Sequence, residues 1–432
     1  MSCGIREYYC GNAKELVTII QGKIIKFHRE IQGLSQSDLG EGICSKTHIS
    51  KIERGITEVS KDTIEVLAKR LCIDMQAEIE TYLSLEGLLK EWHESIILKL
   101  NSKAKRIKEQ LEGIILLQIP DFYRSNTLIL TRYYLLIGEG TLAEVLIKEI
   151  DSWQDLTPYD KNMLLHIKGE FFINYHQEHY KAISYLKLID ITYYNNPEYY
   201  YHLAVAYHCM DSRVLAYYYA NKALTFFTKT HSFTRIIETE MLMLIQVEQE
   251  EHFDPKDSGY PRLIEMADNY GLTEQKAKLL YNYAYQQFRN GSYDKALEYY
   301  RQSLEIRKPT NSQYLMSLEG YLNASTKLGL ASDKELLHLA KKGYSLANKL
   351  NEPMLKHFFQ LHIFKIKNHR EQYYHYLETK VYPIFKDMGY GLAAEVYEIK
   401  LFDYYMEKGD MELANKYALP ILEKYRKNNE LV

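Results

Sequence analysis

A short segment from Leu34 to Gly55 contains the side chains best suited to recognising another molecule. If the segment is helical, its short polar and basic residues lie together on one outward face; they are Lys46, Thr47, His48, Ser50 and Lys51. A helix lying in the major groove can bring such side chains to base edges and phosphates. The segment therefore predicts a surface that reads double-stranded DNA.

Two short helices must position these side chains. Ser35 and Ser45 each precede a helical pattern, where a serine hydroxyl can accept the free N–H groups of a first turn. Gly42 separates the two patterns. The apolar residues that would face inward are Leu34, Leu39, Ile43, Ile49 and Ile52. Together these features predict a helix-turn-helix.

The segment resembles the Xre or lambda-repressor class of helix-turn-helix domains. The class pattern Gln-x-x-Leu is present at Gln36–Leu39, and Ile-Ser-x-Ile-Glu-x-Gly at Ile49–Gly55. The resemblance implies that Gln36 and the residues opening the second helix contact DNA, with Arg54 close to the DNA backbone. The alternative is a degenerate motif that serves only as a folded cap or a dimerisation module.

The rest of the chain carries an internal repeat. The segment from Ala277 to Thr310 spans 34 residues, and its small residues recur where two antiparallel helices must approach closely. A second copy runs from Leu203 to Ala223, and helix patterns of the same kind return near Ala340 and Ala414. The pattern predicts an all-α chain, in which tetratricopeptide-like repeats form a right-handed superhelix.

Stacked repeats of this kind are lined on their concave side by the first helix of each pair. The positions that would point into the groove and bind an extended peptide are Tyr201, His202, Tyr281, Asn282, Tyr285 and Arg289. The amide of Asn282 can both donate to and accept from a peptide backbone, and Arg289 offers a planar fork for a carboxylate. Hydrogen bonds between repeats are an alternative role for both residues.

Composition and charge restrict the remaining functions. Of the 432 residues 46% are hydrophobic, and the net charge of −3 is not that of a basic nucleic-acid protein. Five cysteines without a C-x-x-C pair favour neither disulfides nor a zinc site, and His176 and His179 lack a third ligand. Phosphate-loop, zinc-protease and nucleophile-elbow motifs are missing, so we expect no enzyme, metal or cofactor. With no signal peptide and no long apolar run, we expect no membrane association and a cytoplasmic location.

These observations predict four parts of the chain. They are a tail at 1–15, a DNA-binding domain at 16–73, a linker helix region at 74–112 and a repeat domain at 113–432.

An Xre-type domain followed by tetratricopeptide repeats is similar to the RRNPP group of peptide-sensing regulators, and most like its NprR branch. The resemblance implies a transcription factor that forms homodimers or tetramers on palindromic operator DNA and binds a short signalling peptide in its groove. It also implies a sporulation phosphorelay protein as a partner. Two alternatives are a scaffold that inhibits a partner protein and an enzyme that processes peptides or nucleotides.

Overall fold

The computed structural model describes residues 13–247, 259–329, 331–387 and 391–429. Within these ranges the regular elements are all helices, which confirms the predicted all-α class. Most of the predicted tail at 1–15 lies outside the described residues. No described helix is both long and apolar enough to cross a membrane.

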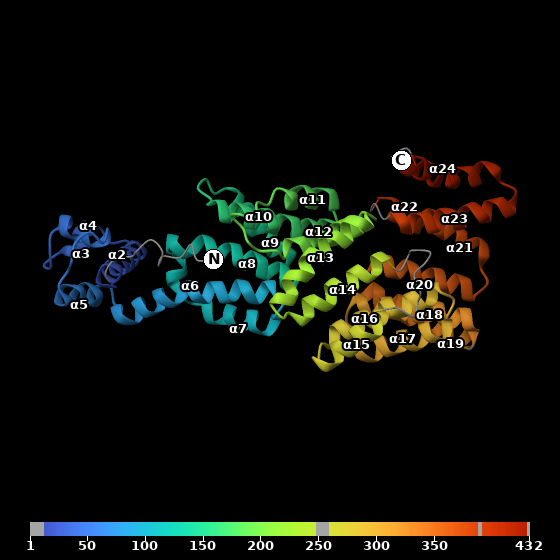
Figure 1. Cartoon of the computed structure of the whole chain (residues 1–432), viewed down its shortest axis with the longest axis horizontal. Helices are drawn as coiled ribbons and strands as arrows, with labels where there is room; N and C mark the ends of the chain where they lie inside the picture. The colour runs from blue at the N-terminus through green and yellow to red at the C-terminus, as the bar shows by residue number, and fades with distance from the viewer. Residues whose placement is uncertain (1–12, 248–258, 330, 388–390, 430–432) are drawn as a thin grey trace. The chain divides into compact units, whose positions relative to one another are not determined.

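The chain divides into two compact units. The first comprises Met1–His176 and Ser184–Glu198, and the second comprises Gln177–Ile183 and Tyr199–Val432. The α-helices that lie wholly in the first unit are α2 (Ala13–Ile31), α3 (Gln36–Gly40), α4 (Lys46–Glu53), α5 (Lys61–Arg70), α6 (Met75–Ile97), α7 (Asn101–Leu111), α8 (Pro120–Ile137), α9 (Gly140–Asp151) and α10 (Pro158–Phe171) (Figure 1). Helix α11 (His179–Lys187) belongs partly to each unit.

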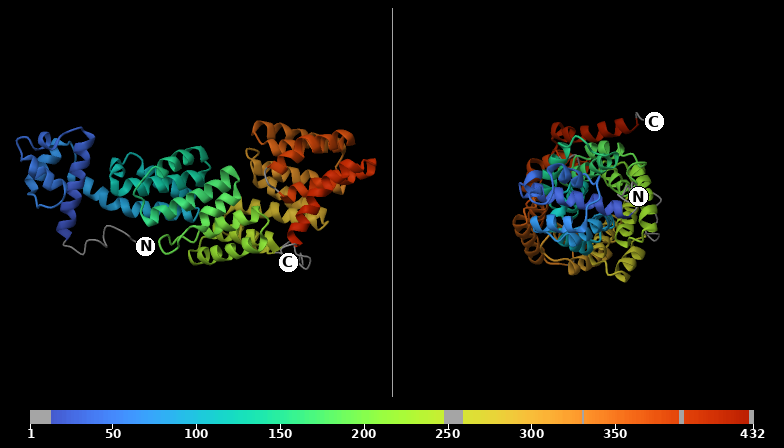
Figure 2. Two further views of the ribbon diagram at one scale, coloured as in Figure 1. Left: turned by 90° about the horizontal axis from the view of Figure 1, so that it is seen from above. Right: turned by 90° about the vertical axis from the view of Figure 1, so that its left-hand side faces the viewer.

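The second unit is a series of helices that pack in sequential order. Its helices are α12 (Tyr199–Cys209), α13 (Arg213–Lys229), α14 (Phe233–Val247), α15 (Tyr260–Asn269), α16 (Thr273–Arg289), α17 (Tyr293–Ile306), α18 (Ser312–Leu328), α19 (Asp333–Lys349), α20 (Pro353–Ile366), α21 (Arg370–Tyr376), α22 (Tyr382–Asp387), α23 (Gly391–Lys408) and α24 (Met411–Asn429) (Figures 1 and 2). Alternate helices also touch: α12 contacts α14, α14 contacts α16, α16 contacts α18 and α18 contacts α20. We call these five helices the first-helix row.

Small residues lie where neighbouring helices in the second unit meet, as the repeat pattern predicted. Ala284 and Ala296 are fully buried between α16 and α17. The hydroxyl of Ser303 donates to the backbone carbonyl of Ala277 at 2.9 Å. A Cβ built on Gly320 would lie 2.4 Å from the ring of Tyr300, so this contact between α17 and α18 requires glycine. Close packing of this kind confirms the tetratricopeptide-like architecture.

A buried ionic network joins the helices of the first unit. Arg132 on α8 and Glu198 are each 1% exposed in their side chains, and the guanidinium Nη2 donates to Oε2 of Glu198 at 2.5 Å. The Nη1 atom of Arg132 lies 3.2 Å from Nε2 of His93 on α6. Because a guanidinium can only donate, this imidazole nitrogen must accept and the ring is neutral. Burial, together with the charge of Arg132, lowers the pKa of His93 to about 3.

The His93 environment predicts a specific loss of stability in acid. Below pH 6.5 the unfolded imidazole takes up a proton that the folded one, with its pKa of about 3, does not. The free energy of unfolding should therefore fall with decreasing pH across that window, by about 1.4 kcal/mol per pH unit from this group alone. His93→Gln retains an acceptor for Arg132 without titrating, so its stability should depend less on pH between 6 and 4.

Urea unfolding can measure this through the fluorescence of the two tryptophans, Trp92 and Trp153, which both lie in the first unit. The exposed His338→Gln serves as the matched control and should keep the wild-type slope. An unchanged slope in His93→Gln would mean that His93 is protonated in the folded protein.

Candidate functional site

The helix-turn-helix forms from the local signals that its sequence contains. The hydroxyl of Ser35 accepts from the backbone N–H of Asp38, and the Asp38 carboxylate accepts from the backbone N–H of Ser35, which completes a capping box. Ser45 caps α4 by accepting from His48 N. Gly42 adopts a φ of +69° in the turn between the helices, a conformation that glycine tolerates without strain. The two predicted caps and the predicted turn are confirmed.

The inner side of α4 is held by the buried carboxylate of Glu53, whose side chain is 3% exposed. Its Oε1 accepts from Nε of Arg29 on α2 at 2.5 Å, and its Oε2 accepts from Nε2 of Gln36 on α3 at 2.7 Å. The hydrogen bond with Glu53 raises the pKa of Arg29. One carboxylate thus ties α4 to both preceding helices. Gln36, which the sequence predicted as a DNA contact, uses its amide nitrogen in this tie.

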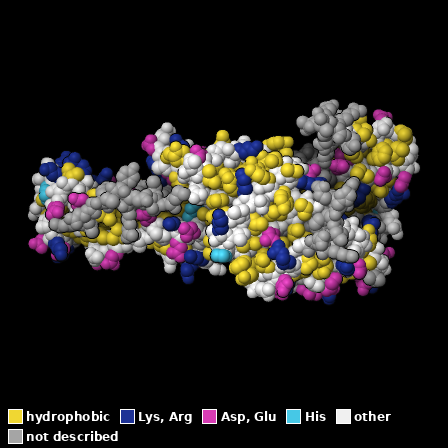
Figure 3. Space-filling view, in the orientation of Figure 1, with side chains coloured by type: hydrophobic (Ala, Val, Ile, Leu, Met, Phe, Trp, Pro, Cys, Tyr) yellow, Lys and Arg dark blue, Asp and Glu magenta, His cyan; other side chains and the backbone are white. Residues whose placement is uncertain are grey.

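The outer side of α4 presents the predicted DNA-reading residues. Lys46, Thr47 and Lys51 are exposed, whereas His48 and Ser50 are half-buried. Figure 3 shows basic side chains gathered over this helix. Arg54 is also exposed at the end of α4, and its Nε donates to the carbonyl of Ser50 at 3.1 Å. The arrangement can bring cations and short polar groups together against a nucleic-acid groove.

Arg70 contributes to this domain in a way that the sequence analysis missed. Its Nη1 donates to the carbonyls of Leu39 at 2.9 Å and Glu41 at 2.6 Å, where α3 ends. The bonds satisfy carbonyl groups that a helix end leaves without partners. A basic residue at the end of α5 gives no sequence signal of this contact, because its acceptors lie about thirty residues earlier.

The predicted peptide-binding residues fall on two separate helices of the first-helix row. On α12, Tyr201 is half-buried with the Arg235 guanidinium 5.2 Å from its ring centre, and His202 is buried. On α16, burial raises the pKa of Tyr281, while Tyr285 and Arg289 are exposed. Helix α14 contacts both α12 and α16, so one helix of the row separates the two groups and they do not form one cluster.

Two amides on α16 have unused hydrogen-bonding capacity. The Nδ2 atom of half-buried Asn282 lies 3.1 Å from the sulfur of Met241 on α14, and a thioether is only a weak acceptor. One turn further, Gln286 is buried, and neither polar atom of its side chain has a hydrogen-bond partner among the described residues. The half-buried amide of Asn282 could bond to the backbone of an extended chain, whereas the amide of Gln286 is closed off from the surface.

A small cavity lies further along the same row of helices. Its volume is about 140 Å³, and it is lined by Glu319 and Asn323 of α18, Phe358, Leu361, His362 and Lys365 of α20, Tyr373 of α21, and Tyr397 and Lys400 of α23. We call it the C-terminal cavity. It was not predicted from the sequence, although Glu319 and Asn323 are four residues apart and therefore share a helix face.

The one carboxylate of the C-terminal cavity is already engaged. The Oε1 atom of Glu319 accepts from Nδ2 of Asn323 at 2.5 Å and lies 3.0 Å from Nε2 of His362. Lys365 and Lys400 reach the surface, but the surrounding protein and their mutual repulsion lower the pKa of Lys400. Desolvation and the charge of nearby Lys327 likewise lower the pKa of Lys365. The cavity is therefore a place where positive charge is concentrated.

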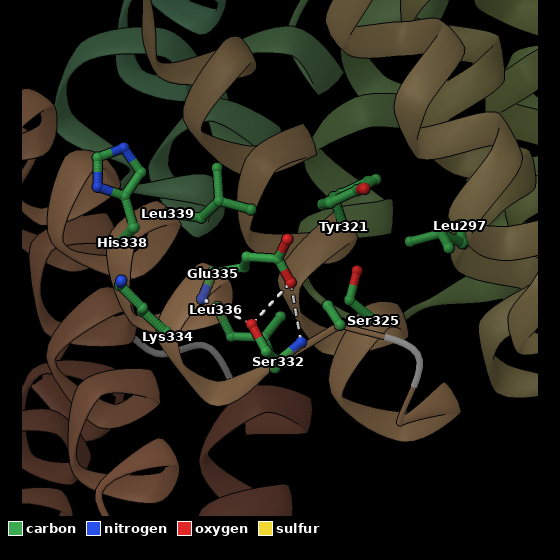
Figure 4. A pocket seen from close by; sticks show the side chains of 10 residues that line it. Leu297, Tyr321, Ser325, Ser332, Lys334, Glu335, Leu336, His338 and Leu339 are labelled. Atoms are coloured by element: carbon green, nitrogen blue, oxygen red, sulfur yellow. Dashed lines mark hydrogen bonds between the residues drawn. The ribbon is translucent and has the colours of Figure 1, made fainter.

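A larger depression of about 880 Å³ is less suited to binding. It is lined by residues of α17, α18 and the start of α19 (Figure 4). Its carboxylate, Glu335, accepts from both N and Oγ of Ser332 and so caps α19. Its polar groups thus maintain the helix end. Across the described residues, no group of three or more His, Cys, Asp or Glu side chains could hold a metal ion.

Comparison with known proteins places these features in context. A family model described as helix-turn-helix matches residues 25–76. The transcriptional activator NprA of Geobacillus stearothermophilus is 22% identical over 403 residues, which cover 88% of this chain and 97% of the relative. The named relative is a transcriptional activator, in agreement with the expectation that the chain is not an enzyme.

Two solved structures share the helical-repeat fold. The apo form of the quorum sensor NprR from B. thuringiensis aligns with a TM-score of 0.61 at 19% identity, covering 79% of this chain and 99% of that one. A Rap protein complexed with Competence and Sporulation Factor aligns with a TM-score of 0.68 at 15% identity, covering 80% and 99%. The helix-turn-helix, the similarity to NprA along most of the chain and the NprR-like and Rap-like repeat fold together support an RRNPP-type regulator.

Proposed function

We propose that this protein is a transcriptional regulator that binds operator DNA through α4 and is switched by a short peptide held along the first-helix row. The observation that carries the proposal is the presence, in one chain, of an exposed basic face on α4 and of the half-buried, weakly bonded amide of Asn282 on α16. The named relatives are consistent with it, because NprA is a transcriptional activator and an NprR structure contains the peptide NprX.

Lys46, Thr47, His48, Ser50 and Lys51 are proposed to face the major groove. Arg54, at the end of α4, would pair with the phosphate backbone, while Gln36 would both approach DNA and position Glu53. Reading a palindrome requires two such helices at a defined spacing, so we propose a homodimer in the cytoplasm. Peptide binding would favour one arrangement of the repeats and so change the spacing of the two reading helices.

A second candidate function is that of a scaffold whose repeats hold a partner such as a sporulation phosphorelay protein. The fold shared with the Rap structure motivates it. A stable complex with such a protein in the absence of operator DNA, together with no peptide binding, would favour the scaffold over the sensor.

The DNA-reading role of α4 can be tested by substitution. Thr47→Ala and His48→Ala should each relax base preference, because a lost contact to a base edge removes about 1 to 3 kcal/mol of discrimination. Selection of binding sequences from a random duplex library by wild type and variants measures this. Glu65→Ala, at an exposed position on α5, is the control and should select the wild-type sequences. If both α4 variants also select them, these side chains do not read bases.

The peptide-binding role of α16 has a separate test. Replacing Asn282 with Ala should leave a buried peptide group unpaired, at a cost of about 1 to 3 kcal/mol, or roughly ten- to a hundredfold in affinity. Peptides of five to ten residues encoded next to the gene can be titrated calorimetrically into wild type and variant. Circular dichroism should show little change in folding.

The control for this titration is Asn221→Ala, an exposed asparagine on α13 outside the first-helix row. It should bind as wild type does. Equal affinities of Asn282→Ala and wild type would assign Asn282 a purely structural role.

A further inference from the structure

The C-terminal cavity has more positive than negative charge among the side chains that line it. Lys365 and Lys400 approach it from α20 and α23, and Lys327 acts on both from α18. Among the described residues, none of the three ammonium groups forms an ion pair with a carboxylate. The one acid that lines the cavity, Glu319, shares its Oε1 between Asn323 and His362.

Several other surface cations of this chain have a carboxylate partner. Lys103 pairs with Glu91, Lys276 with Asp268 and Lys148 with Glu144, each at less than 3 Å. Such pairs are ordinary at a protein surface and contribute little. Lys365 and Lys400, which line the cavity, and nearby Lys327 repel one another, and a bound anion would relieve that repulsion.

The size and lining of the cavity restrict the anion. A cavity of similar volume in another protein accommodates one benzene molecule, so about 140 Å³ admits the end of a chain or one side chain but not a nucleotide. The carboxylate of Glu319 disfavours a dianion such as phosphate. Phe358 and Leu361 supply apolar wall, and burial raises the pKa of Tyr373 to about 12, which keeps its hydroxyl a donor.

We propose that the C-terminal cavity binds a carboxylate of the regulatory peptide, held by the ammonium groups of Lys365 and Lys400. The carboxylate is either the free C-terminus of the peptide or an acidic side chain near one end. This inference rests on the proposed peptide-sensing function and specifies the chemistry of its ligand.

The position of the cavity in the first-helix row agrees with an extended ligand. Asn282 lies on α16, which contacts α18, and α18 contacts α20. Packed helices are about 8 to 10 Å apart, so the path from α16 to α20 is roughly 16 to 20 Å. An extended chain covers about 3.3 Å per residue, so five or six residues would connect the amide of Asn282 with the lysines.

A pair of peptide libraries can test the proposal with the full-length protein. Randomised heptapeptides are prepared with either a free C-terminal carboxylate or a C-terminal amide and are equilibrated with the protein. Bound peptides are then separated by rapid gel filtration and sequenced by mass spectrometry. Wild type should retain the acid form about tenfold more than the amide, as expected for one charge-assisted contact.

The variant Lys365→Met/Lys400→Met should lose this preference, because methionine keeps much of the side-chain length without the charge. Lys341→Met, at an exposed position on α19 that does not line the cavity, is the matched control and should retain it. Circular dichroism verifies that each variant is folded.

Each outcome has a defined meaning. The bound peptides could instead be enriched in Asp or Glu, with no preference for the acid form. If the double variant loses this enrichment, the proposal is supported and the bound carboxylate belongs to a side chain. The carboxylate site is overturned if peptides bind without either preference, or if the double variant retains the preference. In both cases the proposed peptide sensing stands. If neither library yields bound peptide, the proposed sensing function fails and the carboxylate site fails with it.

Discussion

Close approach between helices is the constraint on which the second unit depends. Gly343 of α19 leaves room for the ring of Phe359 on α20, where a Cβ would lie 2.3 Å from a ring carbon. Gly320 of α18 does the same for Tyr300 of α17. Because interiors are close-packed, a methyl group at either place would push two helices apart. The arrangement of the first-helix row, and with it the C-terminal cavity, depends on these contacts.

In the first unit, buried ionic side chains fix how the helices pack. Glu53 holds α4 through Arg29 and Gln36, and Arg132 joins α8 to His93 and Glu198. A buried ion is stable only with its partners in place, and removing one partner is far more damaging than losing a surface pair. Such networks therefore specify one arrangement of helices. For α4 the result is a rigid support under an exposed polar face, which sequence-specific recognition requires.

The two proposed binding chemistries divide the work of holding a peptide. The amide of Asn282 on α16 suits the repeating polar groups of any backbone, so it would give affinity with little regard to sequence. The lysines around the C-terminal cavity suit one charged group and would fix the direction and end of the ligand. A sensor that must respond to one small peptide needs both, because specificity is a difference between affinities.

The sequence alone determined the fold class, the helix-turn-helix and the paired repeat helices, because each is encoded by local signals. Serines at helix starts, a glycine at a turn and small residues at a fixed spacing act within a few turns of chain. The sequence also predicted a groove position for Asn282, but it gave no sign that its amide lies beside Met241 on α14. Tertiary packing alone decided that Arg29 meets Glu53 and that Lys327, Lys365 and Lys400 come near one another, since the residues concerned are 24 to 73 positions apart. No local periodicity encodes contacts over such distances; they follow from how whole helices pack.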